Sequence, residues 1–192
     1  MKKLLTLFFL LLSSPSFATT IDKNSLLDKF ITNLKEKTVK FTQTKTISSI
    51  NKNFTTTGKI KFIKNVGFIF TQETPTTLTF TSTMDKYCTN GQSNTLNNLP
   101  YFSQIKSAID DLLNNNYKKL NEIFNIDYTE TTTNWTLFLT PKNSRINEFI
   151  KVIQITGNQT DLDEIITTYK NNMEINLKFS NSNGNIKDEI KC

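Results

Sequence analysis

Acidic residues in two short clusters are the side chains of this sequence that could do acid–base chemistry or bind a cation. Asp110 and Asp111 are adjacent, and Asp161, Asp163 and Glu164 lie close together further along the chain. Paired carboxylates can act as general acid and base, and carboxylate oxygens are ligands for Ca²⁺. The first pair lies in an apolar pattern of helical period, and the second group follows a turn signal. We therefore interpret both clusters as surface positions, on a helix and on a strand edge.

Two features that the sequence lacks limit the catalytic and metal-binding chemistry that it can support. The sequence contains no histidine, which excludes Ser-His-Asp and Cys-His catalysis and most zinc sites. The glycines are too far apart for a phosphate-binding loop. They are Gly58, Gly67, Gly91, Gly157 and Gly184. We therefore expect a protein that is not an enzyme and that uses neither a metal nor a cofactor.

The N-terminus has the pattern of a secretory signal peptide. Two lysines precede an apolar run from Leu4 to Leu12, and Ser16 and Ala18 are small residues at positions −3 and −1 of a cleavage site. We predict that residues 1–18 are removed and that residues 19–192 form one domain in the periplasm. Ala18 and Thr19, and not a cysteine ready for acylation, stand just after the apolar run, so we expect no lipid anchor at the N-terminus.

The charge is mildly basic. Removing the two signal-peptide lysines leaves 21 basic and 17 acidic residues, a net charge of +4, and Arg145 is the one arginine. Nucleic-acid binders usually cluster Arg and Lys among aromatic residues, whereas these lysines alternate with threonines and apolar residues. We expect no nucleic-acid partner, although a basic face would favour anionic membrane surfaces.

Two cysteines, Cys88 and Cys192, remain in the mature chain. In an oxidising compartment such a pair is typical of one disulfide, which here would join the C-terminal tail to the middle of the chain. The alternatives are two free thiols or a Cys192 that pairs with another chain.

The periodicity predicts an α+β domain with a highly curved antiparallel sheet. A helical pattern over residues 21–36, with Ser25 among the candidate N-caps, is followed by strand-like alternation up to a turn signal at Asn90-Gly91. Helical spacing returns in residues 105–124, and strands follow to residue 179. About nine or ten strands at hairpin spacing, with few helices, favour a sheet that curls.

One face of this sheet is rich in aromatic and aliphatic residues. Three modest helices must cover it, so the apolar side chains either fill an ordinary core or line a cavity. The candidate lining residues, including those of the covering helix, are Val39, Phe41, Ile60, Phe62, Phe68, Phe70, Leu78, Phe80, Ile105, Ile109, Leu112, Trp135, Leu137 and Leu139.

Several motifs, taken in order, resemble the LolA-like family of periplasmic outer-membrane lipoprotein carriers. Residues 41–45 are similar to its F-x-Q-x-K strand, and residues 58–75 to its hairpin of a glycine, alternating apolar residues, a basic residue and a proline. Residues 135–142 resemble its L-x-L-x-P-K strand end. The first helix stands where that family has one.

The resemblance implies a half-open barrel whose apolar concave face, covered by helices around residues 105–113 and 120–124, holds the acyl chains of a lipoprotein. In that family a basic residue, usually Arg, follows the second strand and latches the covering helices, and the position corresponds to Lys64. The alternative for Lys64 is an ordinary lysine at a strand end that points to water.

The resemblance also implies partners. They are acylated lipoproteins as cargo, an inner-membrane ABC exporter that loads them and an acceptor at the outer membrane. We expect a soluble monomer. A carrier of a non-protein lipid, a glycolipid or a polyene pigment, and a lipid-sensing regulatory module of the same fold, are the alternatives.

Overall fold

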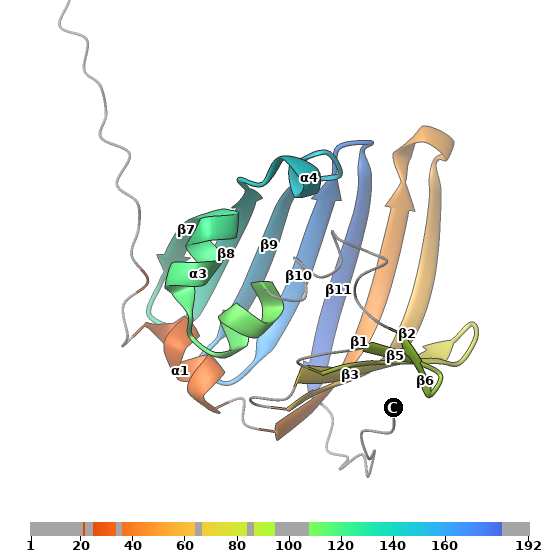
Figure 1. The fold of residues 1–192 in the computed structure, drawn as a ribbon, viewed down its shortest axis with the longest axis horizontal. Helices are drawn as coiled ribbons and strands as arrows, with labels where there is room; N and C mark the ends of the chain where they lie inside the picture. Colours follow the sequence, from red (N-terminus) through yellow and green to blue (C-terminus); the bar gives the residue numbers. More distant parts are fainter. Residues whose placement is uncertain are drawn as a thin grey trace, which may run out of the picture.

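The computed structural model of the 192-residue chain describes residues 21, 25–33, 36–63, 67–83, 87–94 and 108–181. Within these residues, eleven strands form one sheet (Figure 1). The strands are β1 (Glu36–Ile47), β2 (Lys52–Ile63), β3 (Gly67–Thr74), β4 (Leu78–Ser82), β5 (Tyr87–Thr89), β6 (Gln92–Asn94), β7 (Phe124–Glu130), β8 (Asn134–Pro141), β9 (Ile150–Asn158), β10 (Leu162–Tyr169) and β11 (Met173–Asn181). The helices are α1 (Leu26–Asn33), a helical segment at 108–113, α3 (Tyr117–Ile123), α4 (Ser144–Asn147) and the 3-10 turn η1 (Ser48–Ile50).

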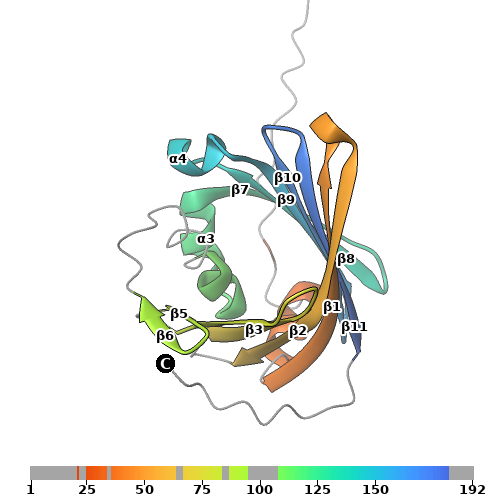
Figure 2. The same ribbon diagram turned by 90° about the vertical axis from the view of Figure 1, so that its right-hand side faces the viewer.

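The sheet consists of two antiparallel meanders joined at their centre. Its order is β6-β5-β4-β3-β2-β1-β11-β10-β9-β8-β7, so the first strand pairs with the last and the edges are β6 and β7. The sheet curves strongly around the helices without closing, as Figure 2 shows. The predicted fold class, a highly curved antiparallel sheet with helices over its concave face, is confirmed.

Alternation of side chains fixes which face of each strand is buried. In β8, Trp135, Leu137 and Leu139 are buried, whereas the intervening Phe138 lies on the opposite, convex face and is only half-buried. Because successive strand residues point to opposite faces, the buried Trp135, Leu137 and Leu139 all lie on the concave side.

The Asn90-Gly91 turn signal marks a hairpin, as predicted. Both residues have positive φ, 49° and 78°, as a tight two-residue hairpin turn requires, and they connect β5 to β6. β6 was missed in the expected count of nine or ten strands. Its sequence, Gln-Ser-Asn, has no apolar residue, so no alternation marks it, and it pairs with β5 in the antiparallel ladder.

Helix α1 is shorter than the predicted helix and begins at its cap. Ser25 is buried, and its hydroxyl accepts a hydrogen bond from the backbone N–H of Asp28 (3.1 Å). Two side chains of β7 complete the cap: the Glu130 carboxylate accepts from the N–H of Leu26 (2.9 Å), and the Tyr128 hydroxyl accepts from the N–H of Leu27 (3.3 Å). These bonds fix α1 against the end of β7.

The second helical region forms two short helices on the concave side. Segment 108–113 ends in a turn where Asn115 has a φ of 55°, and α3 follows with Leu120 fully buried. Phe124, which the helical spacing had assigned to this helix, is instead the first residue of β7, with extended φ and ψ of −126° and 148°. The reason is its pairing with Pro141 of β8, which extends the sheet by one residue at that edge.

Candidate functional site

A cavity of about 280 Å³ lies between the concave face of the sheet and the helices. Helix α1, segment 108–113 and strands β2, β3, β8, β9, β10 and β11 contribute to it. Every described residue that lines it is apolar. These residues are Leu27, Phe30, Ile31, Ile60, Phe62, Phe68, Phe70, Ile109, Leu112, Leu113, Trp135, Ile155, Leu162, Ile165 and Leu177.

One wall is the β2–β3 hairpin. Ile60 pairs with Phe70 and Phe62 with Phe68, so four large side chains stand together on the same face. Phe41 of β1 supports this wall from the side: its ring stacks on Phe70 with ring centres 4.6 Å apart. The wall is therefore a packed aromatic surface whose exposed part faces the cavity.

The other wall is built around Trp135. Its ring lies against Phe30 of α1, with ring centres 5.6 Å apart, and its indole N–H donates to the backbone oxygen of Asn158 (2.8 Å). Its cross-strand partner is Gly157, where a Cβ atom would lie only 2.5 Å from the indole ring. Glycine at this position therefore lets the indole lie flat across β9.

Two tyrosines stand beside the apolar core without adding charge to it. Burial, and next the hydrogen bond that its hydroxyl donates to Glu130 (2.5 Å), raise the pKa of Tyr128 to about 12. Burial, followed by the charge of Asp28, raises the pKa of Tyr117 well above its usual range. Both hydroxyls are therefore neutral at physiological pH, and no titratable side chain lines the cavity among the described residues.

Such a cavity suits hydrocarbon. It offers no donor, acceptor, nucleophile or charge from the described side chains, so binding there depends on the transfer of apolar surface out of water.

The structure brings together half of the fourteen predicted lining residues. Those at the cavity are Ile60, Phe62, Phe68, Phe70, Ile109, Leu112 and Trp135. Val39, Phe41, Leu137 and Leu139 are buried and pack in the two core clusters behind it. Leu78 and Phe80 lie half-buried on β4, where Phe80 packs against Phe68 and Tyr87. Ile105 lies outside the described residues, as does Lys64.

Eight lining residues were not among the predictions. They are Leu27, Phe30, Ile31, Leu113, Ile155, Leu162, Ile165 and Leu177. All belong to elements that the periodicity had predicted. What the sequence lacked was a sign of where along each strand the helices dock.

The acidic clusters lie as interpreted from the sequence, one on a helix and the other at a turn and strand edge. Asp110 and Asp111 are in the helical segment, and Asp161 lies in the β9–β10 turn, where the Asn158 side chain accepts its backbone N–H (3.0 Å). Burial, and next the charge of Asp161, raise the pKa of Asp163. In the ranges that the structure describes, no three His, Cys, Asp or Glu side chains come together as a metal site requires.

Cys88 is 1% exposed in the middle of β5. Cys192 lies outside the described residues, so the bridge between them stays a prediction. Among the described residues, every helix is too short or too polar to span a bilayer.

Comparison with solved structures gives low similarities. The chain is similar to a LolA superfamily protein, NE2245 of Nitrosomonas europaea, with a TM-score of 0.47 and 10% identity over 90% of this chain and 98% of that one. It is also similar to MucB in the MucA/MucB complex of Pseudomonas aeruginosa, with a TM-score of 0.41 and 8% identity over 81% of this chain and 54% of that one. For LprF of Mycobacterium bovis the TM-score is 0.37, with 10% identity over 84% of this chain and 93% of that one. Curated protein sequences give no significant match.

Comparison with protein families gives a match over most of the chain. Residues 17–178 match the family described as outer membrane lipoprotein carrier protein LolA-like, and this range contains every described residue of the cavity wall. The chain therefore belongs to the LolA-like family of outer membrane lipoprotein carrier proteins.

Proposed function

We propose that the protein is a periplasmic carrier that holds the acyl chains of lipoproteins in the apolar cavity and takes them from the inner to the outer membrane. The observation that supports this most strongly is that all fifteen described residues of the cavity wall are apolar, in a member of a carrier family. An ordinary core would fill this space, because protein interiors pack at the density of organic crystals.

Hydrocarbon transfer supplies the binding energy. Each methylene group moved from water into such a cavity contributes about 0.8 kcal/mol, so ten groups contribute about 8 kcal/mol before the cost of ordering the cargo. Binding of this kind needs no covalent step. Release then follows when the cargo finds a more apolar site or when the helices move away from the sheet.

The volume of the cavity limits how much of an acyl chain can be bound. A dry apolar cavity of about 150 Å³ already holds a benzene-sized molecule. The cavity of about 280 Å³ therefore accepts part of one acyl chain in the present arrangement. A cargo with several chains needs more space, and an outward shift of α1 and segment 108–113 from the continuous sheet would provide it.

The proposal includes three partners. An inner-membrane ABC exporter loads the cargo, acylated lipoproteins are the cargo, and an acceptor at the outer membrane receives it. Lys64 latches the covering helices. The protein acts as a monomer.

The test is cargo identification by photo-crosslinking. A photoreactive phenylalanine analogue replaces Phe70 in the cavity wall and, as a control, Phe138 on the convex face of β8. Both proteins are irradiated in the periplasm, purified and analysed by mass spectrometry. We expect acylated peptides attached at position 70 and none at position 138.

Other adducts discriminate among the functions. Free lipid, glycolipid or pigment at position 70 would replace the lipoprotein cargo by a non-protein one. The absence of any adduct at position 70, with the protein folded, would indicate that Phe70 is an ordinary core residue and does not contact cargo.

A further inference from the structure

Large exposed apolar side chains gather at one end of the described structure. Ile50, Phe54 and Phe149 are 55%, 48% and 54% exposed, and they are the large hydrophobic residues that are exposed among the described ones. The first two belong to the β1–β2 hairpin, and the third to the turn between α4 and β9. Side chains of this size are rarely left in water in a group without a binding role.

Strand register places these turns next to each other. At the tip of the hairpin, Ile47 pairs with both Lys52 and Met173, and at the neighbouring strands Tyr169 pairs with Ile150. Two hydrogen bonds join the turns across the end of the sheet. The Ser48 hydroxyl donates to the Asn172 oxygen (2.9 Å), and the Lys170 N–H donates to the Phe149 oxygen (2.8 Å).

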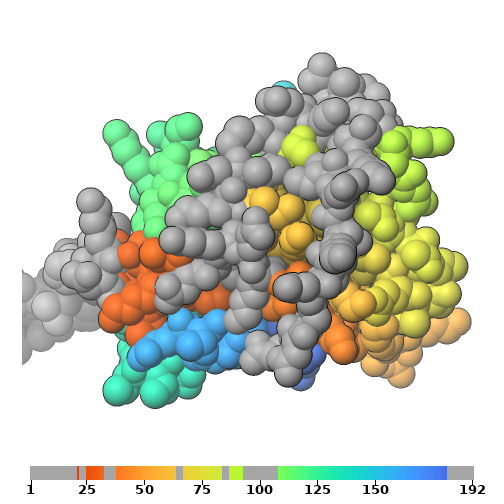
Figure 3. Space-filling model, turned by 90° about the horizontal axis from the view of Figure 1, so that it is seen from below, coloured from red at the N-terminus to blue at the C-terminus, as the bar shows by residue number. Residues whose placement is uncertain are grey.

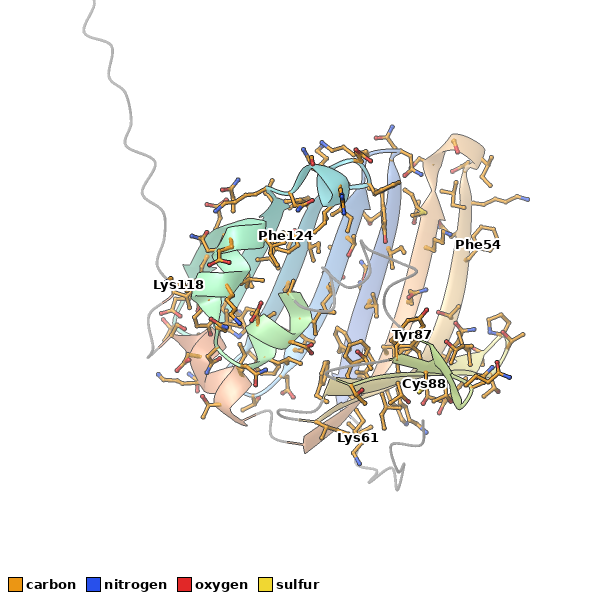
Figure 4. The ribbon with its side chains drawn as sticks, viewed as in Figure 1. Phe54, Lys61, Tyr87, Cys88, Lys118 and Phe124 are labelled. Carbon is orange, nitrogen blue, oxygen red and sulfur yellow. The ribbon has the colours of Figure 1, made fainter. Side chains whose placement is uncertain are left out.

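We call segments 48–54, 142–151 and 170–174 the hairpin end. It forms the upper rim of the sheet in Figure 1, away from α1. Within it, β2 projects beyond β3, because pairing between these strands begins only at Thr57. Figure 4 shows Phe54 on this projecting part, away from the helices.

The hairpin end is basic. It contains five basic residues against two acidic ones, Glu148 and Glu174. The basic residues are Lys52, Lys142, Arg145, Lys151 and Lys170, and all five are exposed.

At the opposite end, the described segments around α1 are acidic. Figure 3 views the molecule from that end, where α1 lies beside the β9–β10 turn. Segments 25–33, 128–134 and 158–163 carry four acidic residues, Asp28, Glu130, Asp161 and Asp163, against Lys29.

We propose that the hairpin end docks reversibly on a phospholipid bilayer that carries anionic headgroups. Lysine and arginine side chains meet the negative surface, and Ile50, Phe54 and Phe149 enter the boundary between headgroups and acyl chains. The apolar residues are spread over the β1–β2 hairpin, which carries Ile50 and Phe54, and the α4–β9 turn, which carries Phe149, and they do not line a groove. This arrangement suits a fluid surface, since no fixed shape of a partner is needed. The proposal does not depend on the cargo of the cavity, because no residue of the hairpin end lines it.

Vesicle flotation tests the proposal. Full-length mature protein is mixed at low ionic strength with vesicles that contain phosphatidylglycerol, or with vesicles of phosphatidylcholine alone. We expect binding to the anionic vesicles, weaker binding to the neutral ones, and release from the anionic ones as salt is added.

Two variants separate the contributions. Ile50→Ser/Phe54→Ser/Phe149→Ser removes the apolar contacts, and Lys151→Glu/Lys170→Glu reverses two charges. Because each basic residue near an anionic surface changes binding about fivefold, we expect the charge variant to bind at least about tenfold more weakly. The matched control is Lys118→Glu/Lys119→Glu, which changes the net charge equally at two exposed positions of α3.

Three outcomes would overturn the proposal. They are wild-type protein that stays unbound to anionic vesicles at low salt, variants of the hairpin end that bind as wild type does, and a control that loses as much binding as the charge variant. Circular dichroism of each variant verifies that a loss of binding is not a loss of fold.

Discussion

Aromatic rings placed over glycines define the cavity walls at the scale of the residue. Phe41 crosses its partner Gly58 to reach Phe70, and Trp135 crosses Gly157 to reach Phe30. A Cβ atom at Gly58 would lie 2.7 Å from the Phe41 ring, closer than real contacts allow. Gly157 thus lets the Trp135 ring lie flat as part of the cavity wall, and Gly58 lets the Phe41 ring support Phe70 from behind that wall.

Phe70→Glu is expected to abolish cargo binding while it lowers the melting temperature only moderately. A carboxylate in a wall without polar partners opposes the entry of hydrocarbon, but at this half-buried position it can still reach water. Binding of a fluorescent fatty acid and thermal unfolding are measured on the same samples. Phe138→Glu, on the convex face of β8, is the matched control and should bind as wild type does. Equal losses of binding and stability in Phe70→Glu would instead indicate a plain core residue.

Lys64→Leu is expected to leave the fold intact and to change cargo release. A lysine stem can pack along apolar surface while its ammonium group donates to backbone oxygens of the covering helices. Transfer of bound lipopeptide to acceptor vesicles, followed over time, measures the release rate. A variant that delivers cargo at the wild-type rate would show that Lys64 does not latch the covering helices.

At the scale of the element, the position of α1 depends on contacts that are distant in sequence. Its first N–H groups bind Tyr128 and Glu130, about one hundred residues away. These contacts determine which parts of the strands become cavity wall and which become core. Leu137 and Trp135 share a face of β8, but Trp135 lines the cavity and Leu137 does not.

Glu130→Gln is expected to weaken the attachment of α1 in a pH-dependent way. The hydrogen bond from Tyr128, and next that from Leu26, lower the pKa of Glu130. A lowered pKa in the folded state means that the ionised carboxylate stabilises the protein above about pH 4.3, the ordinary value, and that this contribution is lost as pH falls through the folded value. The variant should therefore lose about 0.5–1 kcal/mol at pH 7 and less at pH 3.

Urea unfolding at both pH values measures this difference. Glu122→Gln, at an exposed position of α3, is the control and should match wild type. A loss of stability in Glu130→Gln that is the same at pH 7 and pH 3 would contradict the role of the charge.

The two meanders could be predicted from the sequence because alternation of residues such as Trp135, Leu137 and Leu139 is a local signal. The Asn90-Gly91 hairpin was predictable for the same reason. β6 was not, because it has no apolar residue, and the end of α3 was misplaced because Phe124 joins the sheet through Pro141. The full cavity wall could not be predicted either, since which apolar strand residues line the cavity depends on where α1 and segment 108–113 dock rather than on residue type.

At the scale of the whole molecule, the sheet is open, and the first and last strands of the chain are neighbours at its centre. β1 and β11 pair over nine residues, from Val39–Asn181 to Ile47–Met173. This contact joins the halves of the sheet, so the cavity wall draws on both meanders and cannot form from either alone.

The predicted bridge between Cys88 and Cys192 would join the C-terminal tail to the middle of the chain. It would close a loop of about one hundred residues and stabilise the fold by about 4–5 kcal/mol on the chain-entropy model. Alkylation of unreduced, denatured protein should therefore modify neither thiol, and a reductant should lower the melting temperature. Cys192→Ala, which spares the buried Cys88, should melt like the reduced protein. Modification of both thiols without reductant would show that they are free.

Displacement of an apolar fluorescent probe by a lipopeptide tests the carrier proposal most directly. Mature protein, freed of lipid, is loaded with the probe and titrated with a triacylated lipopeptide and, separately, with the same peptide without acyl chains. We predict that the acylated peptide displaces the probe stoichiometrically and that its unacylated twin does not. If neither displaces a probe that binds wild type but not Phe70→Glu, the cavity holds apolar ligands of another class and the lipoprotein cargo is wrong.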